Sequence, residues 1–105
     1  MPMIKDLPSV DMTAAAAQTA VKLGETPFFP GGNCIFRTSV PIGGAGVLTI
    51  EGSANGTTGW YTVRTLNAAQ TARLMAEITD LPPWIRTRVS TVGTGTLQVA
   101  LEGVQ

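Results

Sequence analysis

The chain has 105 residues, of which only 13% are charged, and seven Lys and Arg balance seven Asp and Glu. This length corresponds to one domain with a single core. The balanced charge argues against nucleic acid or an anionic membrane as the main partner. An average protein has about 25% charged residues. The low fraction here fits either a surface that is covered in an assembly or a polar, uncharged surface.

The residue types needed for common catalytic and metal sites are scarce. The chain has no histidine, which removes Ser-His-Asp and Cys-His catalysis and the usual zinc ligand sets. The one cysteine, Cys34, cannot form an internal disulfide, which fits a reducing cytosol, and its place in an alternating strand predicts a buried structural thiol. Glu51 and Glu102 could meet on neighbouring strands as a carboxylate pair, but solvated strand faces are the better interpretation. We therefore predict no catalytic residue, no metal ligand and no cofactor.

The N-terminal third differs in composition from the rest. Prolines at positions 2, 8, 27 and 30 and two glycines at 31–32 interrupt residues 1–32, and the run at 1–8 lacks the apolar centre of a signal peptide. The alanine-rich stretch 13–20 predicts either one helical turn or an extended arm that leads into a strand at 19–23. The apolar loop 25–30 carries Phe28 and Phe29, which we expect to plug one end of the core. We predict an N-terminal arm and loop over 1–32 and a β-sandwich domain over 33–105.

From residue 33 onward, apolar and polar residues alternate as in β-strands. We predict strands at 33–40, 47–52, 60–66, 72–79, 84–91 and 96–104, with residues 67–71 as a connector. The segment 72–79 also fits a helix, and the β context favours a strand with Leu74, Ala76 and Ile78 on one face. The last two strands, separated by a short Gly-Thr-Gly turn, are expected to pair as a hairpin. The prediction is an all-β, small antiparallel β-sandwich of six to seven strands, jelly-roll or discoidin-like, with an extended N-terminal arm.

The residues expected to face inward are those that repeat at every second position of the strands. They are Leu48 and Ile50; Ile85, Thr87 and Val89; and Leu97, Val99 and Leu101. In the strand at 33–40, Cys34, Phe36 and Thr38 share one face, and Ile35, Arg37 and Ser39 share the other. In the strand at 60–66 either face could be the buried one.

Trp84, Arg86 and Arg88 alternate on one strand and share its outward face. Tryptophan and arginine are enriched at the energetic centres of protein interfaces, and they could also stack on a sugar or a base. The structural alternative is a tryptophan at the sandwich edge with both arginines paired to acids such as Glu102. The strand pattern alone leaves these alternatives open.

Three runs carry a family resemblance: EGSANGTTGWYTV at 51–63, LPPWIRTRV at 81–89 and GTLQVALEGVQ at 95–105. Together they resemble the small β-sandwich virion proteins of tailed bacteriophages that decorate or cement the capsid. The turn Gly-Ser-x-x-Gly-x-x-x-Trp and the following Arg-Val strand also resemble discoidin-like sandwiches. The resemblance covers roughly residues 46–105 and is made of turn and strand patterns.

The resemblance implies a non-enzymatic protein that folds in the host cytoplasm and joins the virion at the capsid surface. It implies the major capsid protein as partner and a homo-oligomer, favouring a trimer, with no nucleic acid or membrane bound. We expect the contacts to come from eight candidate interface residues: Trp84, Arg86, Arg88, Ile4, Leu7, Val10, Phe28 and Phe29. A tail, baseplate or neck component is one alternative. A carbohydrate-binding module that stacks sugars on Trp60, Tyr61 or Trp84 is another.

Overall fold

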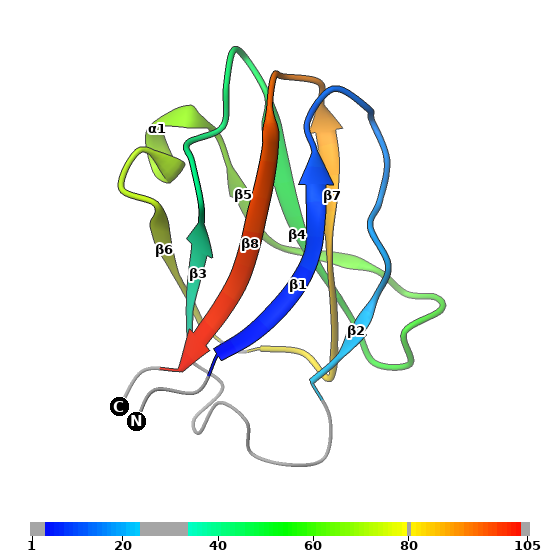
Figure 1. The fold of residues 1–105 in the computed structure, drawn as a ribbon. Helices are drawn as coiled ribbons and strands as arrows, with labels where there is room; N and C mark the ends of the chain where they lie inside the picture. Colours follow the sequence, from blue (N-terminus) through cyan, green and yellow to red (C-terminus); the bar gives the residue numbers. More distant parts are fainter. Residues whose placement is uncertain (1–3, 24–33, 80, 104–105) are drawn as a thin grey trace.

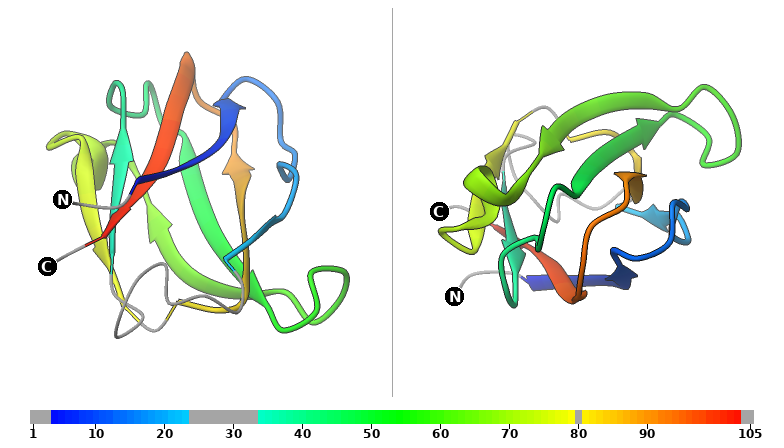
Figure 2. Two further views of the ribbon diagram at one scale, coloured as in Figure 1. Left: turned by 60° about the horizontal axis from the view of Figure 1, so that its bottom comes forward. Right: turned by 90° about the horizontal axis from the view of Figure 1, so that it is seen from above.

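The computed structural model describes residues 4–23, 34–79 and 81–103, which form two four-stranded antiparallel sheets packed face to face (Figures 1 and 2). The strand order is β1-β8-β3-β6 in one sheet and β2-β7-β4-β5 in the other. The elements are β1 (Ile4–Asp11), β2 (Val21–Lys22), β3 (Cys34–Thr38), β4 (Val47–Ser53), β5 (Tyr61–Leu66), α1 (Ala68–Thr71), β6 (Met75–Ile78), β7 (Trp84–Thr91) and β8 (Thr96–Gly103). The predicted all-β sandwich is confirmed.

The core lies between the two sheets and follows the alternation of the sequence. Each strand turns every second side chain inward, and the apolar residues predicted to face inward are buried there. Fully buried side chains from both sheets meet in this layer, among them Phe36, Leu48, Ile50, Ile85, Leu97 and Leu101. The inward faces that the sequence predicts for β4, β7 and β8 are therefore correct, and in β3 the face of Cys34, Phe36 and Thr38 is the buried one.

The first strand belongs to the sandwich, so the extended arm predicted for residues 1–32 is not confirmed. β1 pairs with β8 along its length, and its pairing is interrupted between Leu7 and Val10. Pro8, which has no N–H to donate, lies in this interruption, as expected for a proline in a strand. Leu7, Val10 and Met12 are buried in the core. Their apolar side chains draw this segment into the fold.

The alanine-rich segment begins in a turn, where the Ala14 N–H donates to the Asp11 carbonyl at 3.3 Å, and the chain that follows it is extended. The Gln18 N–H donates to the Thr87 carbonyl at 2.8 Å, and the Val89 N–H donates to the Ala16 carbonyl at 2.9 Å. Residues 16–22 thus run along β7 and end in β2, which lies within the strand predicted at 19–23. Phe28 and Phe29 lie outside the described residues.

The predicted hairpin between the last two strands is wrong, because β7 and β8 belong to opposite sheets. Their four-residue connection crosses from one sheet to the other over the end of the core. The Gly93 N–H donates to the Met12 carbonyl at 2.8 Å, and the Met12 N–H donates to the Gly95 carbonyl at 3.0 Å. Gly93 also packs against Gly46 so closely that an added Cβ would lie 2.7 Å from the Gly46 Cα. The glycines therefore permit a tight crossing between sheets rather than a hairpin.

The connection between β5 and β6 contains the short helix α1. Asn67 caps it, and the Gln70 side chain completes a capping box. The strand prediction for this region is confirmed by β6, where Ala76 and Ile78 are buried. Leu74 was expected on the same strand face, but it has a φ of 63° in the turn before β6 and is 39% exposed.

Candidate interaction surfaces

The outer surface of the β2-β7-β4-β5 sheet carries the arginines that the sequence singled out. We call it the arginine face and define it by Thr49, Glu51, Trp60, Thr62, Arg86, Arg88 and Ser90. The cross-strand register pairs Glu51 with Arg86 and with Thr62, and Thr49 with Arg88. These positions alternate with the inward Leu48, Ile50, Thr87 and Val89, so the same period that builds the core gathers them on the opposite surface.

Glu51 is the electrostatic centre of the arginine face. Its Oε1 accepts a hydrogen bond from Arg86 Nε at 2.8 Å, and its Oε2 lies 4.0 Å from an Arg88 amino group. The guanidinium of Arg86 also lies 4.0 Å from the centre of the Trp60 ring, as a cation–π pair. The side chains of Glu51 and Arg86 are only 11% and 21% exposed, whereas that of Arg88 is 55% exposed. Glu51 and Arg86 are therefore held in one arrangement, and Arg88 projects from it.

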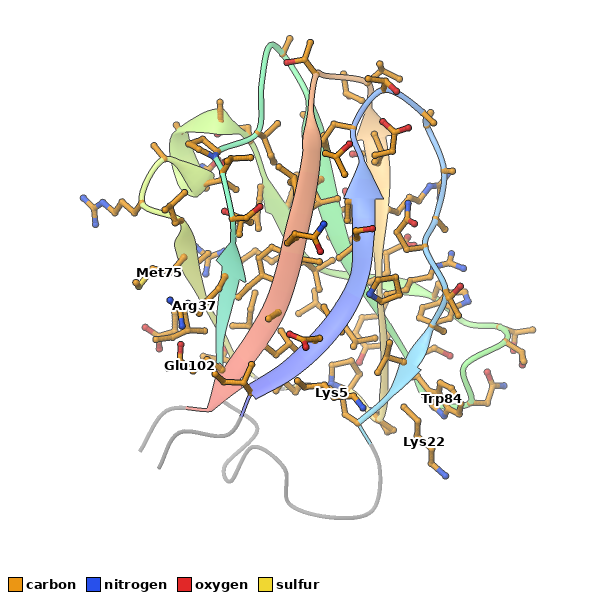
Figure 3. The ribbon with its side chains drawn as sticks, in the orientation of Figure 1. Lys5, Lys22, Arg37, Met75, Trp84 and Glu102 are labelled. Carbon is orange, nitrogen blue, oxygen red and sulfur yellow. The ribbon has the colours of Figure 1, made fainter. Side chains whose placement is uncertain are left out.

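Trp84 packs under the loop between β4 and β5 instead of standing free at the sheet edge. Gly56 of that loop lies directly against the indole, since an added Cβ would lie 2.5 Å from a ring carbon. The loop is fixed by internal hydrogen bonds: Ser53 Oγ donates to the Thr58 carbonyl at 2.6 Å, and Asn55 Oδ1 accepts from the Thr58 N–H at 2.9 Å. Figure 3 shows Trp84 next to this loop and Lys22.

These contacts bear on the sugar-stacking alternative. Trp60 is covered on one ring face by Arg86, and Trp84 is covered by Gly56. Tyr61, at 51% exposed, is the most accessible of the three aromatic residues proposed as platforms.

The outer surface of the β1-β8-β3-β6 sheet has a different character, and Figure 1 looks onto it. We call it the apolar face and define it by Ile4, Asp6, Ile35, Arg37, Met75, Ala100 and Glu102. Ile4 is 53% exposed and Met75 is 48% exposed. Ala100, in the central part of β8, pairs with Asp6 on one side and with Arg37 on the other. The small alanine between longer side chains leaves a shallow hollow of about 400 Å³.

One ion pair lies on the apolar face, and it is far more open to water than the pair at Glu51. The Arg37 guanidinium donates to Glu102 at 2.7 Å, with the two side chains 49% and 22% exposed (Figure 3). Asp6 forms no hydrogen bond or ion pair with any residue that the structure describes. Glu102 thus pairs with Arg37, and the pairing of Glu102 with Arg86 or Arg88 considered from the sequence does not occur.

The remaining chemistry of the described ranges is limited. Burial raises the pKa of the Cys34 thiol from 9.0 to about 12, which keeps it protonated and suits the structural role predicted for it. Within residues 4–23, 34–79 and 81–103, no three His, Cys, Asp or Glu side chains are grouped so that they could hold a metal ion. In the same ranges, no helix has the length and apolar character needed to span a membrane.

The structure places the predicted interface residues in different parts of the fold. Trp84, Arg86 and Arg88 share the outer side of β7 as expected, although only Arg88 is widely exposed. Ile4 lies on the opposite outer surface. Leu7 and Val10 pack in the core, because β1 is an integral strand. The interface prediction for Phe28 and Phe29 concerns residues outside the described part of the chain.

Sequence reasoning missed the acidic partner and the second surface. Glu51 lies in the alternation opposite to Leu48 and Ile50, so its outward position could have been read from the strand pattern. Its neighbour across the sheet could not, because that requires knowing that β4 lies beside β7. The grouping of Asp6, Ala100 and Arg37 likewise depends on β1 pairing with β8.

Comparison of the chain with protein-family models, with curated proteins and with solved structures gives no match.

Proposed function

We propose that this protein is a non-enzymatic structural subunit of a tailed-phage virion that decorates the assembled capsid and binds the major capsid protein through its arginine face. The virion setting is supported by the strand and turn patterns at residues 46–105. The protein-binding role is supported by one observation above all. Arg88, 55% exposed, projects from a surface whose other charged groups, Glu51 and Arg86, are already fixed in place.

A fixed surface favours binding because few side chains must lose freedom when the partner arrives. Ordering one long side chain at an interface costs about 0.5–1.5 kcal/mol. Arg86 is held by Glu51 and Trp60 in the free protein, so this cost falls mainly on Arg88. The two guanidinium groups outnumber the one carboxylate, which leaves a surplus of positive charge among these three residues. The arginine face therefore suits a partner surface that presents a carboxylate.

The test is co-sedimentation of the purified chain with heads assembled from the major capsid protein of the same phage. We expect the wild-type chain to saturate the heads and the Arg88→Ala variant to bind about tenfold more weakly or worse, as an interface arginine does. Arg73→Ala removes the same charge from the turn between α1 and β6 and serves as the matched control. Equal binding by all three proteins would show that the arginine face is not the binding surface. If none of them bound, the capsid would be excluded as the partner.

A tail, baseplate or neck position is separated from the capsid by the number of copies in each virion. Quantitative mass spectrometry of purified particles would give a copy number comparable to that of the major capsid protein for a decoration subunit. A number fitting a single ring would place the protein in the tail or neck instead.

A further inference from the structure

On the apolar face, two successive outward positions of β8 are each flanked by a pair of residues from the neighbouring strands. β8 lies between β1 and β3, so each outward residue of β8 has one neighbour on either side. Around Ala100 these neighbours are Asp6 and Arg37, which carry opposite charges. Around Glu102 they are Ile4 and Ile35, which are both apolar. The row through Ala100 thus has opposite charges on the two sides of β8. The row through Glu102 has an isoleucine on each side.

We propose that the apolar face binds a second copy of this chain about a two-fold axis that runs along β8. Rotation by half a turn about this axis carries the β1 side of one copy over the β3 side of the other. Asp6 of each copy then faces Arg37 of its mate, and Ile4 faces Ile35. The dimer therefore contains two Asp6–Arg37 contacts and two Ile4–Ile35 contacts. A two-fold contact must use one surface patch that is complementary to itself, and these two rows meet that condition.

The local geometry allows the charged groups to reach each other. Ala100 lies on the axis, where its small side chain and the hollow of about 400 Å³ above it give room for long side chains from the mate. Arg37 has five N–H donors, so it can keep its 2.7 Å bond to Glu102 and also donate to the mate's Asp6. Asp6, which forms no bond within the described chain, gains its counter-ion only in the dimer.

One feature opposes the contact and limits its strength. The Glu102 carboxylates of the two copies approach each other near the axis, and among the described residues each has its own Arg37 as counter-ion. The face is also small. Four strands at the usual spacing and the eight residues of β8 span about 19 Å by about 26 Å. A contact of this size lies at the lower end of specific interfaces, so we expect a dimer that dissociates at micromolar rather than nanomolar concentration.

The test uses charge reversal in two separate variants of the full chain. In Asp6→Lys, the new lysine would face Arg37 of the mate, and in Arg37→Glu the new glutamate would face Asp6. Each variant should therefore be a monomer. In an equimolar mixture, a copy of one variant places Lys against Glu and Arg against Asp in a mate of the other variant. The mixture should therefore recover dimerisation, and native mass spectrometry would detect the mixed dimer by its mass.

The matched control replaces Arg37→Glu by Arg73→Glu, which makes the same charge change on the turn between α1 and β6. Its mixture with Asp6→Lys has the same total charge but should form no mixed dimer above the level of a charge-independent contact. Thermal unfolding of each variant checks that the fold is kept. Sedimentation equilibrium gives the masses, with the monomer at 10.9 kDa and the dimer at twice that value.

The proposal is overturned by any of three results. These are a wild-type chain that stays at 10.9 kDa at every concentration, a trimer of the kind implied by the sequence resemblance, and a mixture no better than its Arg73→Glu control. The measurement needs no phage heads, so it can fail while capsid binding through Arg88 holds, and the reverse is also true.

Discussion

The two outer faces of the sandwich each contain a Glu–Arg pair, but the two pairs differ in their exposure to solvent. On the arginine face the Glu51 and Arg86 side chains are 11% and 21% exposed, and the guanidinium also stacks on Trp60. On the apolar face the Arg37 and Glu102 side chains are 49% and 22% exposed. A pair shielded from water keeps its partner, whereas a pair in water can exchange it at little cost. The first face is fixed within the chain, and the second is open to a mate.

Replacement of the glutamate in each pair gives the largest expected difference in stability between the two faces. Glu51→Ala leaves the mostly buried Arg86 without its counter-ion, and we expect it to lower the free energy of unfolding by about 3 kcal/mol. Glu102→Ala should lower it by less than about 1 kcal/mol, because Arg37 remains hydrated. Urea denaturation of both variants measures the two losses. Equal losses would show that the arginine face is no more fixed than the apolar face.

The fixed character of the arginine face extends to Trp84, and two glycines of one loop test it. Gly56 and Gly59 both have a positive φ, 80° and 67°. An added Cβ at Gly56 would strike the Trp84 ring, whereas one at Gly59 meets nothing within 4 Å. We expect Gly59→Ala to cost about 1 kcal/mol from backbone strain alone. Gly56→Ala should cost about 2 kcal/mol, because overpacking adds to the strain. If denaturation gave the same loss for both, Trp84 would be free to move and to meet a partner.

The sequence predicted the two-layered fold well because the alternation of apolar and polar residues within each strand indicates which face is buried. The alternation in β4, β7 and β8 is enough to assign the core, and the buried Ile50 and Leu101 agree with it. It did not predict which strands are neighbours. The turn between β7 and β8 has the composition of a hairpin, and its crossing between sheets depends on Gly46 and Met12, which are distant in sequence.

The two faces show the same limit at the level of function. Arg86 and Arg88 could be found from the sequence because they alternate within one strand. Asp6 and Arg37 could not be associated, because β1 and β3 flank β8 only after the chain has folded. The interpretation of the N-terminal third as an arm is not confirmed, for the same reason. The prolines and alanines of this region obscure the strand pattern around Leu7 and Val10, whose burial depends on pairing with β8.

The inner side of the β1-β8-β3-β6 sheet can be probed through Cys34. Because burial raises its pKa from 9.0 to about 12, the folded state favours the protonated thiol. This contribution to stability is fully present below pH 9.0 and is lost as the pH rises toward 12. We expect the free energy of unfolding to fall by about 1 kcal/mol from pH 9 to about pH 10 because of this group. Cys34→Ala should lack that part of the decline. Parallel pH profiles would contradict the burial of the thiol.

The inner side of the other sheet contains a polar group with the opposite consequence. The Thr87 hydroxyl is buried, with its side chain 1% exposed, and it has no hydrogen-bond partner among the described residues. Replacement by valine keeps the shape and removes the unsatisfied group, so Thr87→Val should raise the free energy of unfolding by about 0.5–1 kcal/mol. Thr49→Val is the matched control on the neighbouring strand β4, where Thr49 precedes Ile50, the cross-strand partner of Thr87. The Thr49 hydroxyl lies on the arginine face, 3.0 Å from the Ser90 hydroxyl, so its loss should lower the stability by a similar amount. Opposite signs in urea denaturation would show that polar groups stabilise the outer face of this sheet and weaken its core. A loss in both variants would mean that the Thr87 hydroxyl has a partner after all.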